Sequence, residues 1–138
     1  MIVVDTNVLV YRTLRSADPA LAALAAEVLD RGNGLLLPPL WRHEFLNALS
    51  TAIKAGMLDL ALGVEIWASA LALAQGSEAP VDMVRALELS RQLDISAYDA
   101  QFVALAEAAN TVLVTEDRRL RQAAGSRAMS MRDHLATR

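Results

Sequence analysis

The feature that most constrains the fold is the spacing of short apolar runs, which lie far apart with helical patterns between them. Short strands that alternate with helices are typical of an α/β domain whose sheet is mainly parallel. We therefore expect about five strands in a single domain that covers residues 1–138. The runs are residues 2–5, 34–38, 111–115 and 128–131, with a weaker candidate at 78–82.

The helical segments between the runs have recognisable ends. Asp18 and Pro19 start the first one, because proline is favoured at the first helical position, and Gly32 closes it. The segment 59–75 is apolar over much of its circumference, so it either provides a surface for a partner or packs inside the protein. The other expected helices cover about residues 40–55, 82–93 and 97–109.

Composition excludes several classes of protein. The chain contains no cysteine, which excludes disulfides and thiolate metal sites. Its most apolar stretch, residues 57–74, contains Asp59 and Glu65, which argues against a membrane span. No signal peptide is visible at the N-terminus, so we expect a cytoplasmic protein. The net charge of −3 gives no overall basic field that would indicate a nucleic-acid partner.

The charge is nevertheless uneven along the chain. From residue 118 onward there are six arginines and a single acid, Asp133. This segment either binds a polyanion or forms a solvated helical face, and the sequence leaves both interpretations open. The arginines are Arg118, Arg119, Arg121, Arg127, Arg132 and Arg138.

Two acids follow expected strands. Asp5 ends the first apolar run, and Asp117 lies two residues past the run 111–115. Ligands of parallel sheets bind outside the carboxyl ends of the strands, which is where both acids would lie. Each acid could instead cap a helix, Asp5 at the segment that begins with Thr6, and Asp117 or Thr115 at the segment that follows.

Two further acids lie on expected helices. Asp99 follows Ser96 with the spacing of a capping box, which favours a structural role when it is considered alone. Glu44 falls at the edge of the apolar face of its helix, and Asn47 shares this edge. A carboxylate in that position either points into a cleft or extends along the surface to solvent.

Considered together, the four acids favour a common site. A parallel sheet would bring them to one end, and gathered carboxylates repel one another unless a cation binds between them. Mg²⁺ and Mn²⁺ prefer such oxygen ligands. The sequence offers no other complete chemistry, since it has no glycine-rich phosphate loop and no convincing Ser-His-Asp set. Its two histidines, His43 and His134, are more typical of surface or packing residues than of ligands.

Four segments, as a set and in this order, resemble the PIN-domain ribonucleases, especially the VapC toxins of bacterial toxin–antitoxin pairs. They are VVDTNVL at 3–9, WRHEFLNAL at 41–49, SAYDAQFVALAE at 96–107 and VLVTEDRRL at 112–120. The resemblance spans nearly the whole chain, although residues 57–93 match only in helical character. It implies a three-layer α/β/α domain with a mainly parallel sheet, carrying Mg²⁺ or Mn²⁺ on Asp5, Glu44, Asp99 and Asp117.

The resemblance also implies an activity and partners. The expected reaction is hydrolysis of RNA phosphodiesters by an endoribonuclease. Asn7 and Thr115 would support the metal ligands, while Arg118, Arg119 and Arg121 would bind flanking phosphates. The family suggests a homodimer bound to a cognate antitoxin. Glu116 stands where many relatives have asparagine or another polar residue, and it adds a negative charge near the site.

Three alternatives remain open. A phosphatase of the haloacid dehalogenase type also begins with a strand that ends in aspartate, but it needs a second aspartate where Asn7 stands and a well-placed later lysine. The others are a PIN-type nuclease that acts on RNA or DNA outside any toxin pair, and a non-catalytic protein-binding module on the same fold. A small adjacent gene for a DNA-binding antitoxin would favour the toxin.

Overall fold

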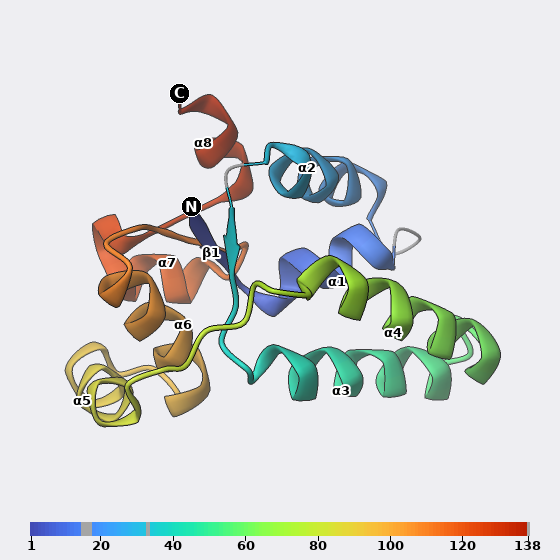
Figure 1. Cartoon of the computed structure of the whole chain (residues 1–138), viewed down its shortest axis with the longest axis horizontal. Coiled ribbons are helices and arrows are strands. Elements are labelled where there is room, and N and C mark those ends of the chain that lie inside the picture. Colours follow the sequence, from blue (N-terminus) through green and yellow to red (C-terminus); the bar gives the residue numbers. More distant parts are fainter. Residues whose placement is uncertain (15–17, 33, 138) are drawn as a thin grey trace.

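The computed structural model describes residues 1–14, 18–32 and 34–137, so Arg138 of the arginine-rich segment lies outside the described residues. The described residues form short strands and helices that alternate along most of the chain (Figure 1). In chain order they are β1 (Ile2–Val4), α1 (Thr6–Thr13), α2 (Pro19–Asp30), β2 (Leu35–Leu36), α3 (Trp41–Lys54), α4 (Leu60–Ala74), α5 (Met83–Leu93), α6 (Ala97–Ala108), β3 (Leu113–Val114), α7 (Arg118–Ala124), a 3-10 turn (Gly125–Arg127), β4 (Ala128–Met129) and α8 (Met131–Ala136).

The strands form one parallel sheet in the order β2-β1-β3-β4. Val3 of the inner strand β1 lies opposite Leu36 of β2 and Leu113 of β3. The weaker candidate strand is reduced to a single parallel bridge between Leu37 and Glu78. The expected α/β fold with a mainly parallel sheet is therefore confirmed, with four strands among the described residues.

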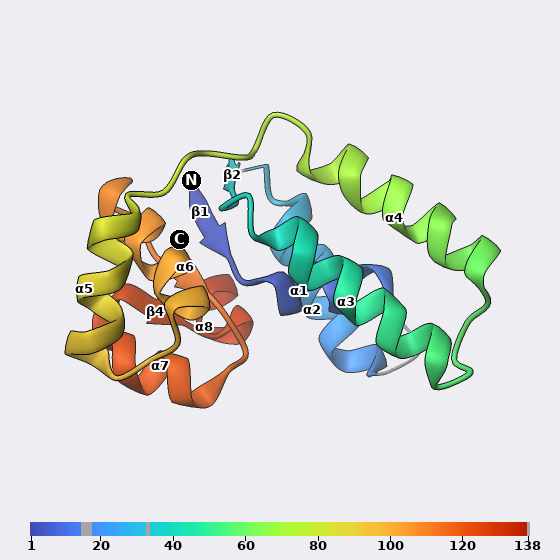
Figure 2. The same ribbon diagram turned by 90° about the horizontal axis from the view of Figure 1, so that it is seen from below.

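Helices cover both faces of this sheet. Successive side chains of a strand point to opposite faces, so β1 contributes to two cores. Val4 packs in a cluster with residues of α1, α2, α3, α4 and α8, whereas Val3 packs in a second cluster with α5, α6 and α7. Figures 1 and 2 show β1 between α1, α3 and α4 on one side and α5, α6 and α7 on the other. The result is the expected order of layers: helices, sheet, helices.

The ends of the helices follow the local signals. Asp18 accepts hydrogen bonds from the backbone N–H groups of Ala20 and Leu21, and Pro19 occupies the first position of α2. The expected run 128–131 needs a correction, because β4 ends at Met129. Ser130 caps α8 by accepting a hydrogen bond from the N–H of Asp133, so the chain turns into a helix there.

Helix α4 lies on the surface alongside α3, so packing inside the protein, one of the two alternatives for residues 59–75, is wrong (Figure 2). Leu60, Leu62 and Val64 are 68%, 46% and 59% exposed. Gly63 is buried against α3, where a Cβ would lie 2.8 Å from Cδ1 of Ile53, so a larger residue would push the two helices apart. None of the described helices is long and apolar enough to cross a membrane.

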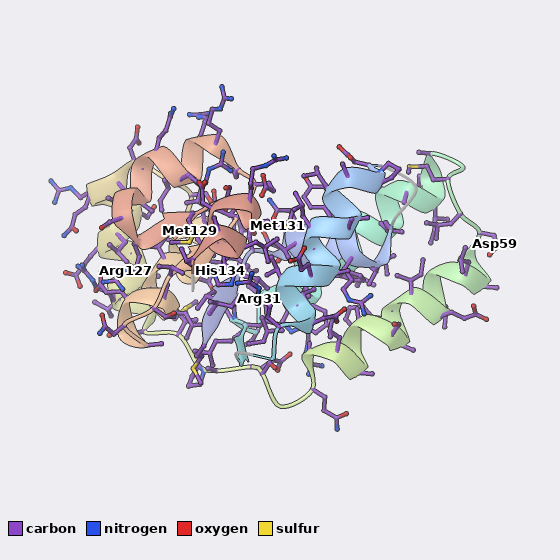
Figure 3. All side chains as sticks on the ribbon, turned by 90° about the horizontal axis from the view of Figure 1, so that it is seen from above. Arg31, Asp59, Arg127, Met129, Met131 and His134 are labelled. Carbon is purple, nitrogen blue, oxygen red and sulfur yellow. The ribbon has the colours of Figure 1, made fainter. Side chains whose placement is uncertain are left out.

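Helix α8 is held against α2 by polar contacts. Arg31 donates hydrogen bonds to the carbonyl oxygens of Leu135 and Thr137, and it lies close to His134 (Figure 3). His134 is buried, and its Nε2 has no hydrogen-bond partner among the described residues. Burial, followed by the charges of Arg31 and the N-terminal amino group, lowers the pKa of His134. The contact therefore favours the neutral imidazole.

We expect this histidine to make the fold sensitive to mild acid. Because the pKa of His134 is lower in the folded state, the unfolded chain takes up its proton first as the pH falls below about 6.5. The contribution of neutral His134 to stability is present above that pH and is lost as the pH falls through the folded pKa. Urea unfolding at pH 7.5 and pH 5.0 should therefore show a smaller acid-induced loss in His134→Gln than in wild type. The exposed His43→Gln is the matched control, and equal losses in His134→Gln and wild type would contradict this role.

Candidate active site

The carboxyl edge of the sheet brings Asp5 and Thr115 together. Asp5 follows β1 and Thr115 follows β3, and the N–H of Asp5 donates to the carbonyl oxygen of Val114. The Thr115 hydroxyl donates a 2.7 Å hydrogen bond to Oδ2 of Asp5. Thr115 is fully buried and Asp5 is 8% exposed. The parallel pairing of the two strands therefore fixes the position of the Asp5 carboxylate.

Asp5 occupies the N-cap position of α1 but does not cap it. Its side chain accepts no capping hydrogen bond from the first turn of the helix. Burial raises the pKa of Asp5 to about 6, the Thr115 hydrogen bond opposes that rise, and the charges of Glu44 and Asp99 add to it. A buried carboxylate next to two other carboxylates costs free energy, so helix capping does not account for Asp5.

Glu44 faces the same region from α3. The Thr6 hydroxyl donates a 2.8 Å hydrogen bond to Oε1 of Glu44, which links the start of α1 to α3. Glu44 is half-buried, and its pKa is raised by burial, with a further contribution from the charge of Asp99, against the Thr6 hydrogen bond. This carboxylate therefore points inward from the edge of the apolar face, whereas Asn47 is exposed.

Asp99 takes part in the expected cap through its backbone. Its N–H donates to Oγ of Ser96, the N-cap residue of α6. Its carboxylate is half-buried, and burial, followed by the charge of Asp117, raises its pKa. A hydrogen bond from the Ser96 side chain opposes this rise in pKa, so Asp99 both belongs to the cap of α6 and lies within electrostatic range of Asp117.

Asp117 is a helix cap, as one of the alternatives expected. Its Oδ1 accepts a hydrogen bond from the N–H of Leu120 at 3.1 Å, at the start of α7. Its own N–H donates to Oγ1 of Thr115, also at 3.1 Å. Thr115 therefore contacts Asp5 through one hydrogen bond and Asp117 through another, which ties the ends of β1 and β3 to α7.

The carboxylate of Glu116 has two partners of its own. Oε1 of Glu116 accepts a hydrogen bond from the N–H of Met131, the first residue of α8, and Oε2 lies 3.8 Å from Arg121. Arg121 also donates to the carbonyl oxygen of Thr115. The guanidinium of Arg121 thus has internal partners, whereas Arg118 and Arg119 are exposed.

Two residues of α1 lie near the acids. Oδ1 of Asn7 is buried and has no hydrogen-bond partner among the described residues. Tyr11, one turn later, has a pKa raised by burial and then by the charges of Glu116, Asp18 and Asp5. Sequence reasoning missed Tyr11, although its spacing of four residues from Asn7 places the two on the same side of a helix.

The oxygen atoms of these side chains are of the type that a hard divalent cation prefers as ligands. They are carboxylate oxygens, with the buried amide oxygen of Asn7 close by in the chain, and no ion pair between described residues involves any of the four acids. Besides burial, the charges of Glu44 and Asp99 raise the pKa of Asp5, and the charge of Asp117 raises that of Asp99, so Asp99 connects Asp117 to the other two acids. The described residues nevertheless contain no group of three acids or histidines close enough to hold a metal as they stand. The ligand set Asp5, Glu44, Asp99 and Asp117 therefore stays a prediction.

A groove of about 560 Å³ adjoins two of these acids. Asp99 and Asp117 line it together with Arg119 and with Asp94 and Gln122. No local pattern in the sequence indicated the last two residues, since they come from the α5–α6 link and from α7. Three carboxylates and one guanidinium, that of Arg119, are the charged groups among the residues that line the groove, so Arg119 marks the place in it that would attract a phosphate.

Comparisons with known proteins place this geometry in a family. The model of the PIN domain family matches residues 2–126. The fold matches the crystal structure of PAE2754 from Pyrobaculum aerophilum with a TM-score of 0.74 and 24% sequence identity. That match covers 98% of this chain and 86% of the other. No curated protein gives a significant match.

Proposed function

Since this chain belongs to the PIN-domain family, we propose that it is a divalent-metal-dependent endoribonuclease, the toxin of a toxin–antitoxin pair. PIN domains are typically nucleases and generally use divalent metal ions. The observation that carries the proposal is the buried Asp5 carboxylate, which does not cap its helix and lies within electrostatic range of Glu44 and Asp99. A cation at this position would relieve the repulsion and offset the cost of burial.

Each proposed residue has a distinct task. Asp5 and Asp117 are held by Thr115, and Asp5, Asp99 and Asp117 would be the ligands of Mg²⁺ or Mn²⁺. Bound there, the ion would stabilise negative charge on the phosphate and make water more acidic. Thr6 holds Oε1 of Glu44, which leaves Oε2 to orient the attacking water, accept its proton or bind a second ion. Asn7 would support the site by accepting, through Oδ1, a hydrogen bond from a water bound to the ion.

The test is cleavage of matched nucleic acids. Wild-type protein should cut an end-labelled single-stranded RNA in Mg²⁺ or Mn²⁺ and not in EDTA, and it should leave DNA of the same sequence intact. Cleavage of DNA as well would favour the alternative nuclease outside a toxin pair. Failure to cut either polymer in both metals would overturn the enzymatic proposal and favour the non-catalytic module.

Substrate binding should depend on Arg119 more than on Arg121. Arg119→Ala should weaken RNA binding and reduce the slope of log K against log salt by about 1, because Arg119 is exposed in the groove. Arg121→Ala should lower thermal stability while the salt slope stays close to that of wild type, because Arg121 contacts Thr115 and Glu116. The exposed Arg132→Ala is the control. Titrations at several salt concentrations would contradict this assignment if Arg119→Ala left the slope unchanged.

The proposal extends to a homodimer, a cognate antitoxin and action in the cytoplasm, where the RNA would be cut. Support comes from the exposed apolar side chains of α4 and from an apolar groove of about 380 Å³ between α3 and α4, lined in part by Leu46, Leu60 and Val64. Large exposed apolar patches are typical of interaction surfaces. Light scattering of the protein alone, and co-purification with the product of an adjacent small gene, would test the two partners separately.

A further inference from the structure

The groove beside Asp99 and Asp117 is lined by residues of two further parts of the chain, helix α7 and the link between α5 and α6. On α7, Gln122 lies five residues after Asp117, which corresponds to about 7.5 Å along a helix. On the other wall, Asp94 lies five residues before Asp99, in the link between α5 and α6. Arg119 lies between Asp117 and Gln122 in the chain. The far part of the groove is thus about one nucleotide away from the candidate active site.

The far part of the groove has an apolar floor. Leu93, Ile95 and Ala123 line it and are only partly exposed, and Leu93 and Ile95 pack against the core of α5, α6 and α7. The total volume of about 560 Å³ falls in the range of small-molecule sites, which is about 300–1,000 Å³. An unstacked base of single-stranded RNA can rest on such a surface, while its edge stays available for hydrogen bonds.

Asp94 presents unpaired acceptors in this groove. No ion pair or side-chain hydrogen bond between described residues involves its carboxylate, and the residue is exposed. Its backbone is left-handed, with φ 53°, which aspartate and asparagine both tolerate. The backbone therefore explains a short polar side chain at this position, but it does not explain the charge.

The chemistry of the groove favours one base. A carboxylate only accepts hydrogen bonds, and guanine presents two adjacent donors, N1–H and N2–H, on its Watson–Crick edge. Uracil presents a single N–H between two carbonyl oxygens, which a carboxylate repels. The Gln122 amide can donate to O6 of guanine, and Arg119 can contact the phosphate that joins this nucleotide to the cleaved bond.

We propose that this groove is a nucleobase subsite that selects guanine beside the cleaved phosphodiester, with Asp94 as the residue that determines specificity. The inference rests on the proposed function, since it names part of the RNA that the same site would cut. In this subsite Gln122 makes a second contact with the base. Arg119 contacts the phosphate, and this contact does not depend on the RNA sequence.

The test is a binding measurement that does not need cleavage. Asp5→Asn protein is titrated in Mg²⁺ with labelled pentauridine RNA and with five versions that carry one guanosine at each position, and binding is followed by fluorescence anisotropy. Guanosine at one position should tighten binding about tenfold, in the lower range for a bidentate base contact. Adding Asp94→Asn should reduce this preference to less than about twofold, and Gln122→Ala should reduce it partly. Gln92→Ala, an exposed glutamine outside the groove, should leave the preference unchanged.

Two results would overturn the subsite. One is equal or undetectable binding of all six RNAs, and the other is a guanosine preference that persists in Asp94→Asn. Arg119→Ala should weaken the binding of all six RNAs by a similar factor, and an effect confined to one RNA would contradict its role at the phosphate. Failure of the proposed function is observed separately, as the absence of metal-dependent RNA cleavage by wild type.

Discussion

Asp5→Asn is expected to lose about 10²–10³-fold in RNA cleavage while its metal-free fold becomes more stable. Stabilisation of the reacting phosphate by a metal is worth several kcal/mol, and each 1.36 kcal/mol corresponds to a factor of ten in rate. Asparagine retains an acceptor for the Thr115 hydroxyl but removes a buried charge that lies beside Glu44 and Asp99. The measurement is cleavage of end-labelled RNA together with thermal melting in EDTA and in excess Mn²⁺.

The gain in stability should depend on pH. Because the pKa of Asp5 is raised from 3.8 to about 6 by folding, its contribution to stability is present at low pH and is lost as the pH rises through about 6. In EDTA at pH 8, the free energy of unfolding of Asp5→Asn should be about 1 kcal/mol greater than that of wild type. This gain is less than the roughly 3 kcal/mol that corresponds to a pKa shift of two units. Below about pH 3 this pH-dependent difference should vanish, because Asp5 is then neutral in both the folded and unfolded states.

Asp5→Ala separates a site from a helix cap. A cap would cost about 1 kcal/mol on replacement by alanine. The Asp5 side chain does not cap α1, but alanine also leaves the buried Thr115 hydroxyl without its acceptor, and we expect the removal of the buried charge to offset that cost, so that the net loss is small. Mn²⁺ should raise the melting temperature of wild type by mass action, and this effect should shrink in both variants. Two results together would contradict a catalytic role for Asp5. The melting temperature of wild type would not change with metal, and Asp5→Ala would be destabilised but would still cut RNA.

Thr115→Val is expected to reduce cleavage by about 10–100-fold, the usual cost of losing a group that orients metal ligands. Valine has nearly the same shape but cannot donate to Asp5 or accept from the N–H of Asp117. The buried partners would then lack a hydrogen bond, which should also cost about 1–3 kcal/mol of stability. The cleavage rate as a function of Mn²⁺ concentration should shift to higher concentrations.

The conservative control for this residue is Thr115→Ser. Serine keeps the hydroxyl, so it should retain most of the activity and the Mn²⁺ dependence of wild type. Loss of the Thr115 hydrogen bond should raise the pKa of Asp5 further, which moves the acidic limb of the pH–rate profile to higher pH only in the valine variant. Equal activity and equal metal dependence in the two variants would show that Thr115 only fills space.

The fold could be predicted from the sequence because the residues that start and end its helices act over short distances in the chain. Asp18 with Pro19, and Ser96 before α6, mark helix starts by interactions within three residues. Asp5 was ambiguous for the opposite reason. A helix cap and a site residue would both be an aspartate directly after this strand, so the local sequence is the same for the two roles. The hydrogen bond from Thr115, which lies 110 residues away in the chain, distinguishes them. The structure removes the capping alternative for Asp5 and confirms it for Asp117.

Other features of the site depended on packing that no local pattern shows. Glu116 was expected to add a negative charge near the acids, and its carboxylate has partners of its own that no local pattern shows, the N–H of Met131 and the guanidinium of Arg121. Arg121 belongs to a run of arginines, yet the turn of α7 directs it to the carbonyl oxygen of Thr115. The groove that contains Asp94 and Gln122 forms only when the α5–α6 link packs beside α7.

Binding of Mn²⁺ tests the central claim most directly, namely that these four carboxylates form a cation site. Electron paramagnetic resonance measures the free Mn²⁺ that remains in the presence of wild type and of Asp5→Asn, Glu44→Gln, Asp99→Asn and Asp117→Asn. We expect wild type to bind Mn²⁺ and the three aspartate variants to bind it at least about tenfold more weakly, with a smaller effect for Glu44→Gln. The claim of a cation site would be contradicted if wild type did not bind Mn²⁺. It would also be contradicted if all four variants bound Mn²⁺ as tightly as wild type.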